Sequence, residues 1–467
     1  MLRQDSFFLF HSGCPLPSWV WRGTLGVIVF RLGGIALFRG TFAIVDERAI
    51  SHNVAAIRSL LKPGTRLMVP VKANGYGHGA LAVARTALSA GATDLGVATV
   101  EEAVELRKGG IAAPILVLGY VSPSAARAAA AWQIAVTLAD DWSELNLPAF
   151  EPSLHIHIKV DTGMNRIGLK SVPDVLRVAK WAMRRPDVTL TGVFTHLACA
   201  DAPDLAHAGG QMAQFDEVLE ALEEAGIAVP IIHAANSAAT LRVPDWRYDM
   251  VRVGISSYGY LPDPSLQLES PILLLPALNV YSSITRLETL HVGETVGYGA
   301  NFTAKRTTRL ATVPVGYADG YPRLLGNRAE VVIHHQRAPI VGNVCMDQLM
   351  VDVTDVEVCN VGDCVTLYGR YAPNHWNLRE LDAIETKNKE DWLLHSFAST
   401  YSLIGAVVTP INEGITLESA HSGHPKNLAA ILSLDELAAH AHTISYELMC
   451  ALSNRIPRLY VKHYFDL

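Results

Sequence analysis

Cysteine, charge and long apolar runs are all scarce in this sequence of 467 residues. Its six cysteines form no CxxC pair and no metal-ligand spacing, so free thiols in a reducing compartment are expected rather than a disulfide framework. No uninterrupted run of about 18 apolar residues is present, so no membrane span and no stable membrane association are predicted. Hydrophobic residues make up 50% and charged residues 18%, which excludes a disordered chain and predicts a soluble globular protein. Together with the free thiols, this makes the cytoplasm the expected location.

Basic residues are also in the minority. The 38 Lys and Arg residues against 45 Asp and Glu give a formal net charge of −7, so no basic surface is expected for nucleic acid.

Residues 1–41 are atypical, because Thr24–Phe38 is apolar except for Arg31, yet no small-residue cleavage site follows. We therefore expect an N-terminal extension there rather than a signal peptide or an anchor.

After Gly40, short runs rich in Val and Ile alternate with amphipathic stretches. Gln211–Glu224, for example, carries Phe215, Val218 and Leu222 at helical spacing. Such alternation is typical of βαβ units, and eight strands with intervening helices predict a closed (β/α)8 TIM-type barrel over residues 42–275. The candidate strands are Leu67–Val71, Leu95–Val100, Ile115–Gly119, Ile134–Ala139, His155–Val160, Leu190–Thr195, Ile231–Ala235 and Met250–Ser256.

From about Pro276 the pattern changes to denser β-branched alternation broken by Gly turns. This pattern predicts a second, mostly antiparallel β domain over residues 276–467. A polar, irregular stretch at about 371–430 is predicted to be an insert in that domain. Ser433 and Glu436 then form a capping-box pattern, which predicts a helix directly after the insert.

Reactive side chains follow the predicted barrel strands, at the end where such barrels place their active sites. Lys72 ends the first strand beside apolar Val71, and desolvation there would lower its pKa and supply the neutral amine that Schiff-base chemistry needs. The alternative is a rim lysine whose stem packs while its ammonium reaches water. Other residues at strand ends are Lys159, Arg166, His196, His233, Ser237 and Arg252.

Two histidines precede Lys159 on its strand. His155, His157 and Lys159 alternate and should point to one side of the strand. A metal site is conceivable, but no carboxylate or cysteine completes it, so packing inside the barrel is favoured and no metal is expected.

Eight motifs occur in an order that resembles the alanine racemase family, over roughly residues 42–370 and 431–461. Each motif alone is weak, but the ordered set is specific. The motifs are VPVKANGYGHG at 69–79, KVDTGMNRIG at 159–168, HAANSAA at 233–239, RVGISSYG at 252–259, VGYGA at 296–300, GYADGYPR at 316–323, VCMDQ at 344–348 and TISYE at 443–447.

The resemblance implies a pyridoxal 5'-phosphate enzyme that interconverts L- and D-alanine and supplies D-alanine for peptidoglycan. It implies that Lys72 anchors the cofactor and handles the proton on one face, while Tyr298 is the base on the other. Racemisation needs both, because a proton must leave one face of a planar carbanion and return to the opposite face. A tyrosine with a pKa near 10 needs help, which the resemblance assigns to His196, His233 and Arg252. The resemblance also places His233 among the cofactor-binding residues.

Arg252, by the same resemblance, faces the pyridine nitrogen of the cofactor. A permanently protonated arginine donates to that nitrogen without readily protonating it, which limits electron withdrawal. Related barrel decarboxylases have an acidic residue there, so Arg252 favours racemisation over decarboxylation. Without the resemblance, a strand arginine paired with Asp249 would be the simpler interpretation.

Phosphate binding is implied for five groups that are suitable anion donors. They are Ser237, the backbone amides of Gly254 and Ile255, Tyr76 and Tyr446. Ser237 could instead only cap the following helix, and Tyr446 could be a buried aromatic residue.

The substrate carboxylate is implied to bind Arg166, helped by the backbone amide of Met346. Lys159 matches a lysine that can be carbamylated to orient this arginine, and the alternative is an ordinary ion pair with Asp161. Tyr317 resembles part of a gate at the substrate entrance.

A homodimer is implied, since Tyr298 and Met346 of such enzymes enter the partner's barrel and each site is shared. A racemase of broader specificity, for serine or others, stays open because motifs do not give pocket size. A non-catalytic protein that binds pyridoxal phosphate for homeostasis also stays open, but such proteins lack a second domain. Asn165 departs from the pattern, which often has a small residue there.

Overall fold

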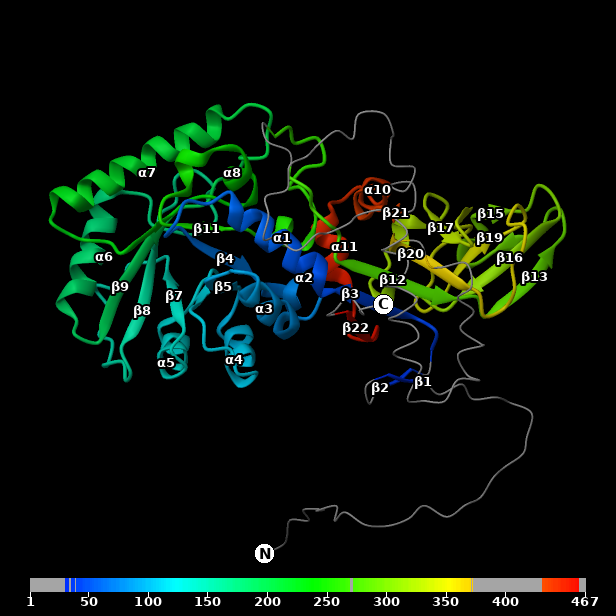
Figure 1. Ribbon diagram of the computed structural model, residues 1–467, viewed down its shortest axis with the longest axis horizontal. Helices are drawn as coiled ribbons and strands as arrows, with labels where there is room; N and C mark the ends of the chain where they lie inside the picture. Colours follow the sequence, from blue (N-terminus) through cyan, green and yellow to red (C-terminus); the bar gives the residue numbers. More distant parts are fainter. Residues whose placement is uncertain are drawn as a thin grey trace, which may run out of the picture.

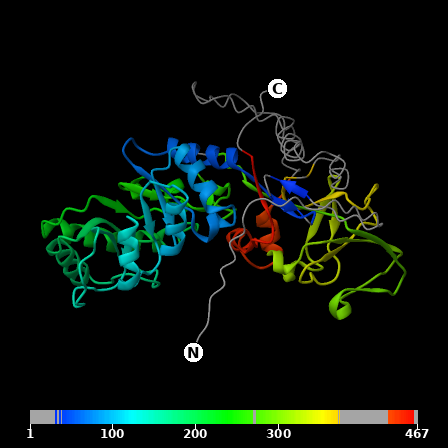
Figure 2. The ribbon, with the colours of Figure 1, turned by 90° about the horizontal axis from the view of Figure 1, so that it is seen from below.

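A computed structural model describes residues 30–32, 35–37, 39–268, 272–370, 372 and 431–461. Almost all of the predicted insert at 371–430 lies outside these residues, as does most of the predicted extension. The described chain forms a barrel and a β domain side by side, with the segment after residue 430 between them (Figure 1). A view turned by 90° shows the same two bodies (Figure 2).

Eight parallel strands form the barrel, in the order β10-β9-β8-β7-β6-β5-β4-β11. Backbone hydrogen bonds from Asp249 N to Ile232 O and from Arg252 N to Ala235 O bring β11 against β10 and close the ring. The predicted TIM-type barrel is thus confirmed. Its strands are β4 (Arg66–Pro70), β5 (Asp94–Val97), β6 (Ile115–Val117), β7 (Ala135–Leu138), β8 (Leu154–Lys159), β9 (Val188–Phe194), β10 (Ile231–His233) and β11 (Met250–Arg252).

Helices cover the outside of the barrel, and most start at a side chain that caps them. Thr99, Ser122, Ser171 and Asn236 each accept a backbone N–H in the first turn of the helix that follows. The helices are α1 (Glu47–Ser59), α2 (Lys72–Tyr76), α3 (Ala80–Ser89), α4 (Val100–Lys108), α5 (Pro123–Ala131), α6 (Val172–Arg184), α7 (Ala206–Glu224) and α8 (Ser237–Arg242), with short 3-10 turns η1 (Pro244–Arg247) and η2 (Ile255–Tyr258).

The β domain contains a sheet in the order β18-β17-β20-β12-β3-β22, a sheet β13-β16-β19 and a ribbon β14-β15. All pairs are antiparallel except β22 with β3, in agreement with the predicted mostly antiparallel domain. Its strands are β12 (Leu278–Ser283), β13 (Arg286–Leu290), β14 (Thr295–Val296), β15 (Phe302–Thr303), β16 (Thr308–Val313), β17 (Glu330–Ile333), β18 (Gln336–Pro339), β19 (Leu349–Asp352), β20 (Cys364–Arg370), β21 (Ile431–Leu432), which pairs with β20, and β22 (Arg458–Val461).

Strand β3 (Phe42–Asp46) belongs to this second sheet, although the sequence analysis places its residues at the start of the barrel segment. It pairs with β12 on one side and with β22 on the other. All five residues are buried. The chain therefore crosses from the β domain into the barrel at Asp46, whose carboxylate caps α1.

Two short helices after residue 430, α10 (Leu434–His440) and α11 (Ser445–Ala451), lie between the two bodies (Figure 1). The predicted helix at Ser433 is α10, and the Ser433 side chain caps it by accepting from the Asp435 amide. The Glu436 carboxylate, the other member of the predicted capping box, forms an ion pair with Arg337. Helix α11 lies against α2, and a Cβ on Gly77 would come within 2.0 Å of the carbonyl oxygen of Met449. Only glycine permits that approach, since Gly77 also has φ +79°.

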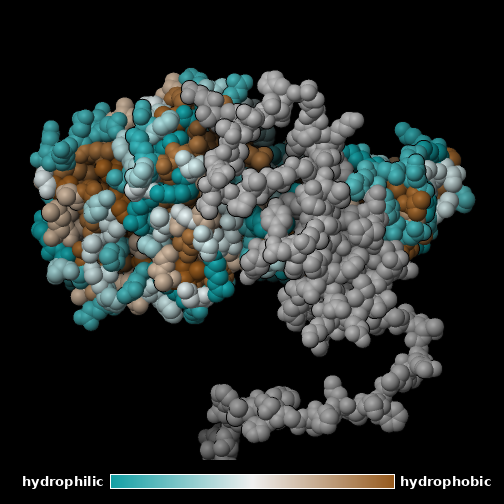
Figure 3. Space-filling model, viewed as in Figure 1, coloured by the Kyte–Doolittle hydropathy of each residue, from teal (hydrophilic) through white to brown (hydrophobic). Residues whose placement is uncertain are grey.

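No helix among the described residues is long and apolar enough to cross a membrane. On the face shown in Figure 3, apolar side chains on the barrel form small patches separated by hydrophilic ones.

Candidate active site

A cavity of about 740 Å³ opens at the carboxyl ends of the barrel strands. It receives side chains from the ends of β8 and β11, from α2, and from α11 of the C-terminal segment. The predicted site residues that line it are Lys72, Tyr76, Lys159, Arg166, His196, Ser237, Arg252, Gly254, Ile255 and Tyr446. Topology therefore brings together residues that are as many as 374 positions apart, from Lys72 to Tyr446 (446 − 72).

Lys72 starts a turn with unusual backbone geometry. Ala73 and Asn74 have φ of 51° and 53°, in the left-handed region that residues other than glycine rarely adopt. Glu102 and the side chain of Asn74 hold this turn, with hydrogen bonds from Ala73 N to Glu102 Oε1 at 2.7 Å and from Ala80 N to Asn74 Oδ1 at 3.0 Å. Burial, followed by the nearby positive charge of Arg166, lowers the pKa of Lys72.

Donors for an anion gather around Tyr76. A Cβ on Gly254 would lie 2.7 Å from the Tyr76 hydroxyl oxygen, so glycine leaves room for that hydroxyl. Ser237 begins α8, and Ile255 begins η2 directly after its N-cap residue Gly254, where the first backbone amides have no partner within the helix. Burial raises the pKa values of Tyr76 and Tyr446, which keeps both hydroxyls protonated as donors. These groups fit a phosphate dianion.

Arg252 lines the cavity although it is almost fully buried, and it makes only neutral contacts among the described residues. Its Nη1 donates to His233 Nδ1 at 2.9 Å, and its Nη2 approaches His196 Nδ1 at 3.2 Å and two backbone carbonyls. Asp249 instead accepts from the amide of Ile232, so the alternative Arg252–Asp249 pair is not formed. Burial lowers the pKa of Arg252 to about 9, which leaves the guanidinium charged at neutral pH.

Both histidines beside Arg252 are neutral. Burial, followed by the positive charge of Arg252, lowers the pKa values of His196 and His233 well below the usual range. Their Nδ1 atoms face arginine N–H donors and must accept, so each Nε2 carries the proton. His196 lines the cavity, whereas His233 is fully buried behind Arg252 and does not.

Lys159 is a buried amine without a carboxylate partner among the described residues. Its Nζ donates to Val160 O at 2.7 Å and lies 5.3 Å from the centre of the Phe194 ring. The Asp161 carboxylate accepts instead from the amides of Gly163 and Asn165, so the alternative Lys159–Asp161 ion pair is not formed. Burial and then Arg252 lower the pKa of Lys159 to about 7.

Arg166 is exposed and lines the cavity from the loop after β8. The residue before it, Asn165, has φ of 55°. Glycine and asparagine are the residues that adopt this conformation most readily, which explains physically why asparagine is accepted here.

Tyr298, Tyr317 and Met346 lie apart from the cavity. Their side chains are 72%, 43% and 52% exposed, on loops of the β domain. Hydrogen bonds from Tyr317 N to Cys345 O and from Asn343 Nδ2 to the Tyr298 carbonyl join these loops to one another. A single chain therefore does not bring Tyr298 or Met346 to Lys72.

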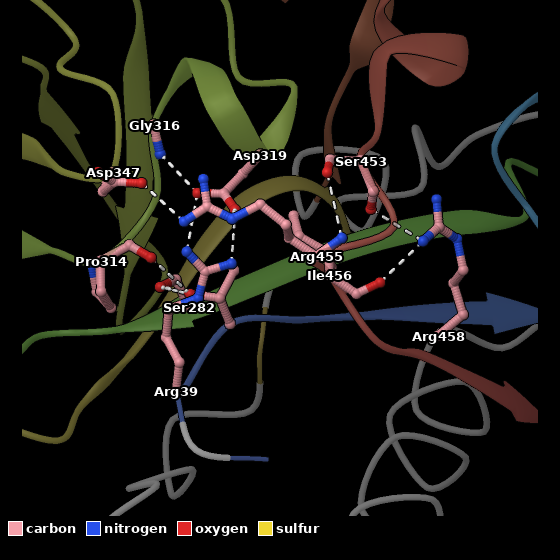
Figure 4. Close-up of polar contacts among 11 residues, drawn as sticks. Arg39, Ser282, Pro314, Gly316, Asp319, Asp347, Ser453, Arg455, Ile456 and Arg458 are labelled. Carbon is pink, nitrogen blue, oxygen red and sulfur yellow. Dashed lines mark hydrogen bonds and ion pairs between the residues drawn. The ribbon is translucent and has the colours of Figure 1, made fainter. Parts of the chain in front are cut away.

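A buried carboxylate supports these exposed loops (Figure 4). Asp319 accepts two hydrogen bonds from Arg39, at 2.6 and 2.9 Å, and one from the Gly316 amide at 3.0 Å. Arg455 lies 3.6 Å from the same carboxylate and bonds Asp347 at 2.7 Å. This network was not predicted from the sequence, although Asp319 lies in the GYADGYPR motif. Arg39 falls within the predicted extension at 1–41, whereas residues 39–41 are part of the fold.

Other cavity residues were also missed. Glu102 and Cys450 line the cavity, and Glu102 joins two strand-end loops by accepting from the amides of Ala73 and Ala98. Glu102 lies in the first turn of α4, the helix that follows β5, and this position could have indicated that its side chain reaches the cavity. The described residues contain no group of three side chains suited to a metal ion.

Comparison with known proteins gives a consistent result. Residues 45–262 match the family "Alanine racemase, N-terminal domain", and residues 277–391 match "Alanine racemase, C-terminal domain". The alanine racemase of Symbiobacterium thermophilum is 40% identical over 90% of this chain and 97% of its own. That of Geobacillus stearothermophilus is 37% identical over 91% and 94%. The crystal structure of alanine racemase from Bacillus anthracis with bound L-Ala-P superposes with a TM-score of 0.74 at 31% identity, covering 91% of this chain and 96% of that one.

Proposed function

The chain belongs to the alanine racemase family, and from this premise we propose how its own residues interconvert L- and D-alanine. The observation that carries the proposal is the cavity in which Lys72, Arg252 and the anion donors around Tyr76 converge. The cofactor we propose is pyridoxal 5'-phosphate. Bound there, it would supply an electron-withdrawing ring that acidifies the α-C–H bond of alanine.

We assign cofactor binding to both ends of the cavity. The hydroxyls of Tyr76, Ser237 and Tyr446 and the amides of Gly254 and Ile255 would hold the phosphate. Arg252 would donate to the ring nitrogen, and its charge would keep that nitrogen from taking a proton. Lys72 would be the covalent anchor, because its lowered pKa makes the neutral, nucleophilic amine accessible.

Two bases on opposite faces would move the proton at the α-carbon. Lys72 would serve one face and Tyr298 of the partner subunit the other, which makes the enzyme a homodimer with shared sites. Tyr298 and Met346 are exposed in a single chain, which supports this arrangement. Side chains that enter the partner's barrel must not be packed against the barrel of their own chain. His196, with its proton on Nε2, would donate to the hydroxyl oxygen of the partner's Tyr298. This hydrogen bond would stabilise the negative charge of the deprotonated tyrosine.

Arg166 and the partner subunit's Met346 amide would hold the alanine carboxylate, and Tyr317 would narrow the entrance. Lys159 would orient Arg166 once carbamylated, a reaction that requires the neutral amine favoured by its pKa of about 7. Cytoplasmic supply of D-alanine for peptidoglycan is the cellular role that fits these assignments. Action on serine or other amino acids is the alternative.

The deciding experiment measures D-amino acid formation from a panel of L-amino acids with added pyridoxal phosphate. L-alanine should be racemised fastest, and Lys72→Ala should lose both the activity and the visible absorbance of the bound cofactor. Faster turnover of serine would replace the alanine assignment, and an unchanged visible band in the variant would reject Lys72 as the anchor.

A second experiment tests the shared site. Lys72→Ala and Tyr298→Phe subunits, each inactive alone, are mixed under conditions in which exchange is demonstrated. One intact site per hybrid dimer should restore part of the activity. No recovery would contradict a site built from two chains.

A further inference from the structure

A second cavity, of about 590 Å³, lies at the opposite end of the barrel, where the strands begin. Its lining includes His155 and His157 of β8, together with Arg66 and Arg107. Arg66 is paired with Asp94, and Arg107 donates to backbone carbonyls. His157 is different, because it connects this cavity to the site at the other end of the barrel.

A chain of hydrogen bonds runs from Arg252 through His233 to His157. Arg252 Nη1 lies 2.9 Å from His233 Nδ1, and His233 Nε2 lies 2.9 Å from His157 Nδ1. An arginine only donates, so the direction of the whole chain is fixed. His233 must accept at Nδ1 and donate from Nε2, and His157 must accept at Nδ1.

Burial keeps both rings neutral, as this direction requires. His233 is fully buried and His157 is 4% exposed. Burial, then the charges of Arg66 and Arg252 and the neighbouring His155, lower the pKa of His157 to about 3. A doubly protonated ring would have no acceptor nitrogen, and the chain would break.

The backbone makes a place for the His157 ring. Ile156 pairs with Leu190 but His157 pairs with Gly192, so β9 has one additional residue, Thr191, at this point. This shift puts glycine opposite the histidine, where a Cβ would lie 2.4 Å from His157 Nδ1. A register shift of this kind redirects a side chain at the cost of regular pairing, and here it directs Nδ1 towards His233.

We propose that His157 is a positioning residue for the racemase site: it accepts from His233, holds His233 in the tautomer that accepts from Arg252, and thereby fixes the guanidinium. The inference rests on the function proposed above. Without His157, the His233 ring loses the acceptor that selects its tautomer, and the other tautomer directs an N–H at Arg252. The arginine would then lose its alignment with the cofactor, whereas alanine binding at Arg166 would be unaffected.

The test compares two polar replacements of similar character. His157→Asn keeps an acceptor near the position of Nδ1, whereas His157→Gln moves the amide away from it. His155→Leu is the matched control, since His155 lies two residues away on β8, lines the same cavity and, among the described residues, bonds only Thr191. For each purified holoenzyme, kcat, KM for alanine and the dissociation constant of pyridoxal phosphate are measured, with a crystal structure of His157→Gln.

We expect His157→Gln to lower kcat about tenfold and to weaken cofactor binding about tenfold, the effect of one lost buried hydrogen bond, with little change in KM. His157→Asn should stay within about threefold of the parent enzyme, and His155→Leu within about twofold. In the crystal structure, Arg252 Nη1 should have left His233 Nδ1.

Equal losses in all three variants would show general damage to the barrel end and overturn the inference, as would an unchanged Arg252 position in His157→Gln. If His157→Gln does not fold while His157→Asn does, cofactor binding by His157→Asn at parental strength still supports the acceptor role, and weakened binding refutes it. Failure of the parent protein itself to bind the cofactor or racemise alanine would reject the proposed function, not this step.

Discussion

Replacing Arg39 by methionine should destabilise the protein more than loss of an ordinary surface charge. The Asp319 carboxylate is fully buried, and Arg39 supplies two of its hydrogen bonds. Removal of one partner from a buried ion pair costs about 3–5 kcal/mol. Two features reduce this cost: the Arg39 side chain is 25% exposed, and Arg455 remains 3.6 Å from the Asp319 carboxylate. We therefore expect Arg39→Met to lower the free energy of unfolding by about 2 kcal/mol.

The measurement is urea unfolding of Arg39→Met, Asp319→Asn and the double variant. A double-mutant cycle should give a coupling energy above about 1 kcal/mol. Arg306→Met is the control, because Arg306 and Asp355 form an exposed pair, and it should leave the unfolding midpoint unchanged. If Arg39→Met behaves like this control, the chain at residues 39–41 does not anchor the loops that carry Tyr317.

Three further predictions concern the cavity and the exposed loops. Burial lowers the pKa of Lys159 to about 7 from 10.5, so the unfolded chain binds more protons between these values and stability rises with pH there. Lys159→Met should accordingly raise the free energy of unfolding most below about pH 7 and less as the pH approaches 10; urea unfolding at several pH values checks this, and a gain independent of pH would contradict it. Gly254→Ala places a methyl group 2.7 Å from the Tyr76 hydroxyl oxygen, so titration with pyridoxal phosphate should show affinity at least about tenfold weaker, and unchanged affinity would reject the phosphate site. Tyr298→Phe should abolish racemisation but leave the unfolding midpoint unchanged, since this side chain is 72% exposed; a large loss of stability would indicate a structural role within its own chain.

Much of the site could be predicted because each barrel unit is local. A strand, the residue that ends it and the following helix are contiguous in sequence, so Lys72 or Arg252 could be placed at the cavity from their position after an apolar run. The eight candidate strands follow from the same alternation, and the motif order indicated the family.

Interactions between distant segments could not be predicted in this way. The sequence of β3 is compatible with either body, and only its pairing with β12 and β22 decides that it lies in the second sheet. The contact of Arg39 with Asp319 spans 280 residues, and no local pattern reports it.

The sequence by itself determined the barrel, the second β domain and the identity of the reactive side chains, because these depend on short-range periodicity and residue chemistry. Tertiary structure alone decided which carboxylate Arg39 meets, that Lys159 has no carboxylate partner in the described chain, and in which direction Arg252, His233 and His157 pass their hydrogen bonds. These features depend on hydrogen-bond distances of about 3 Å between residues far apart in the sequence, and only the folded chain sets such distances.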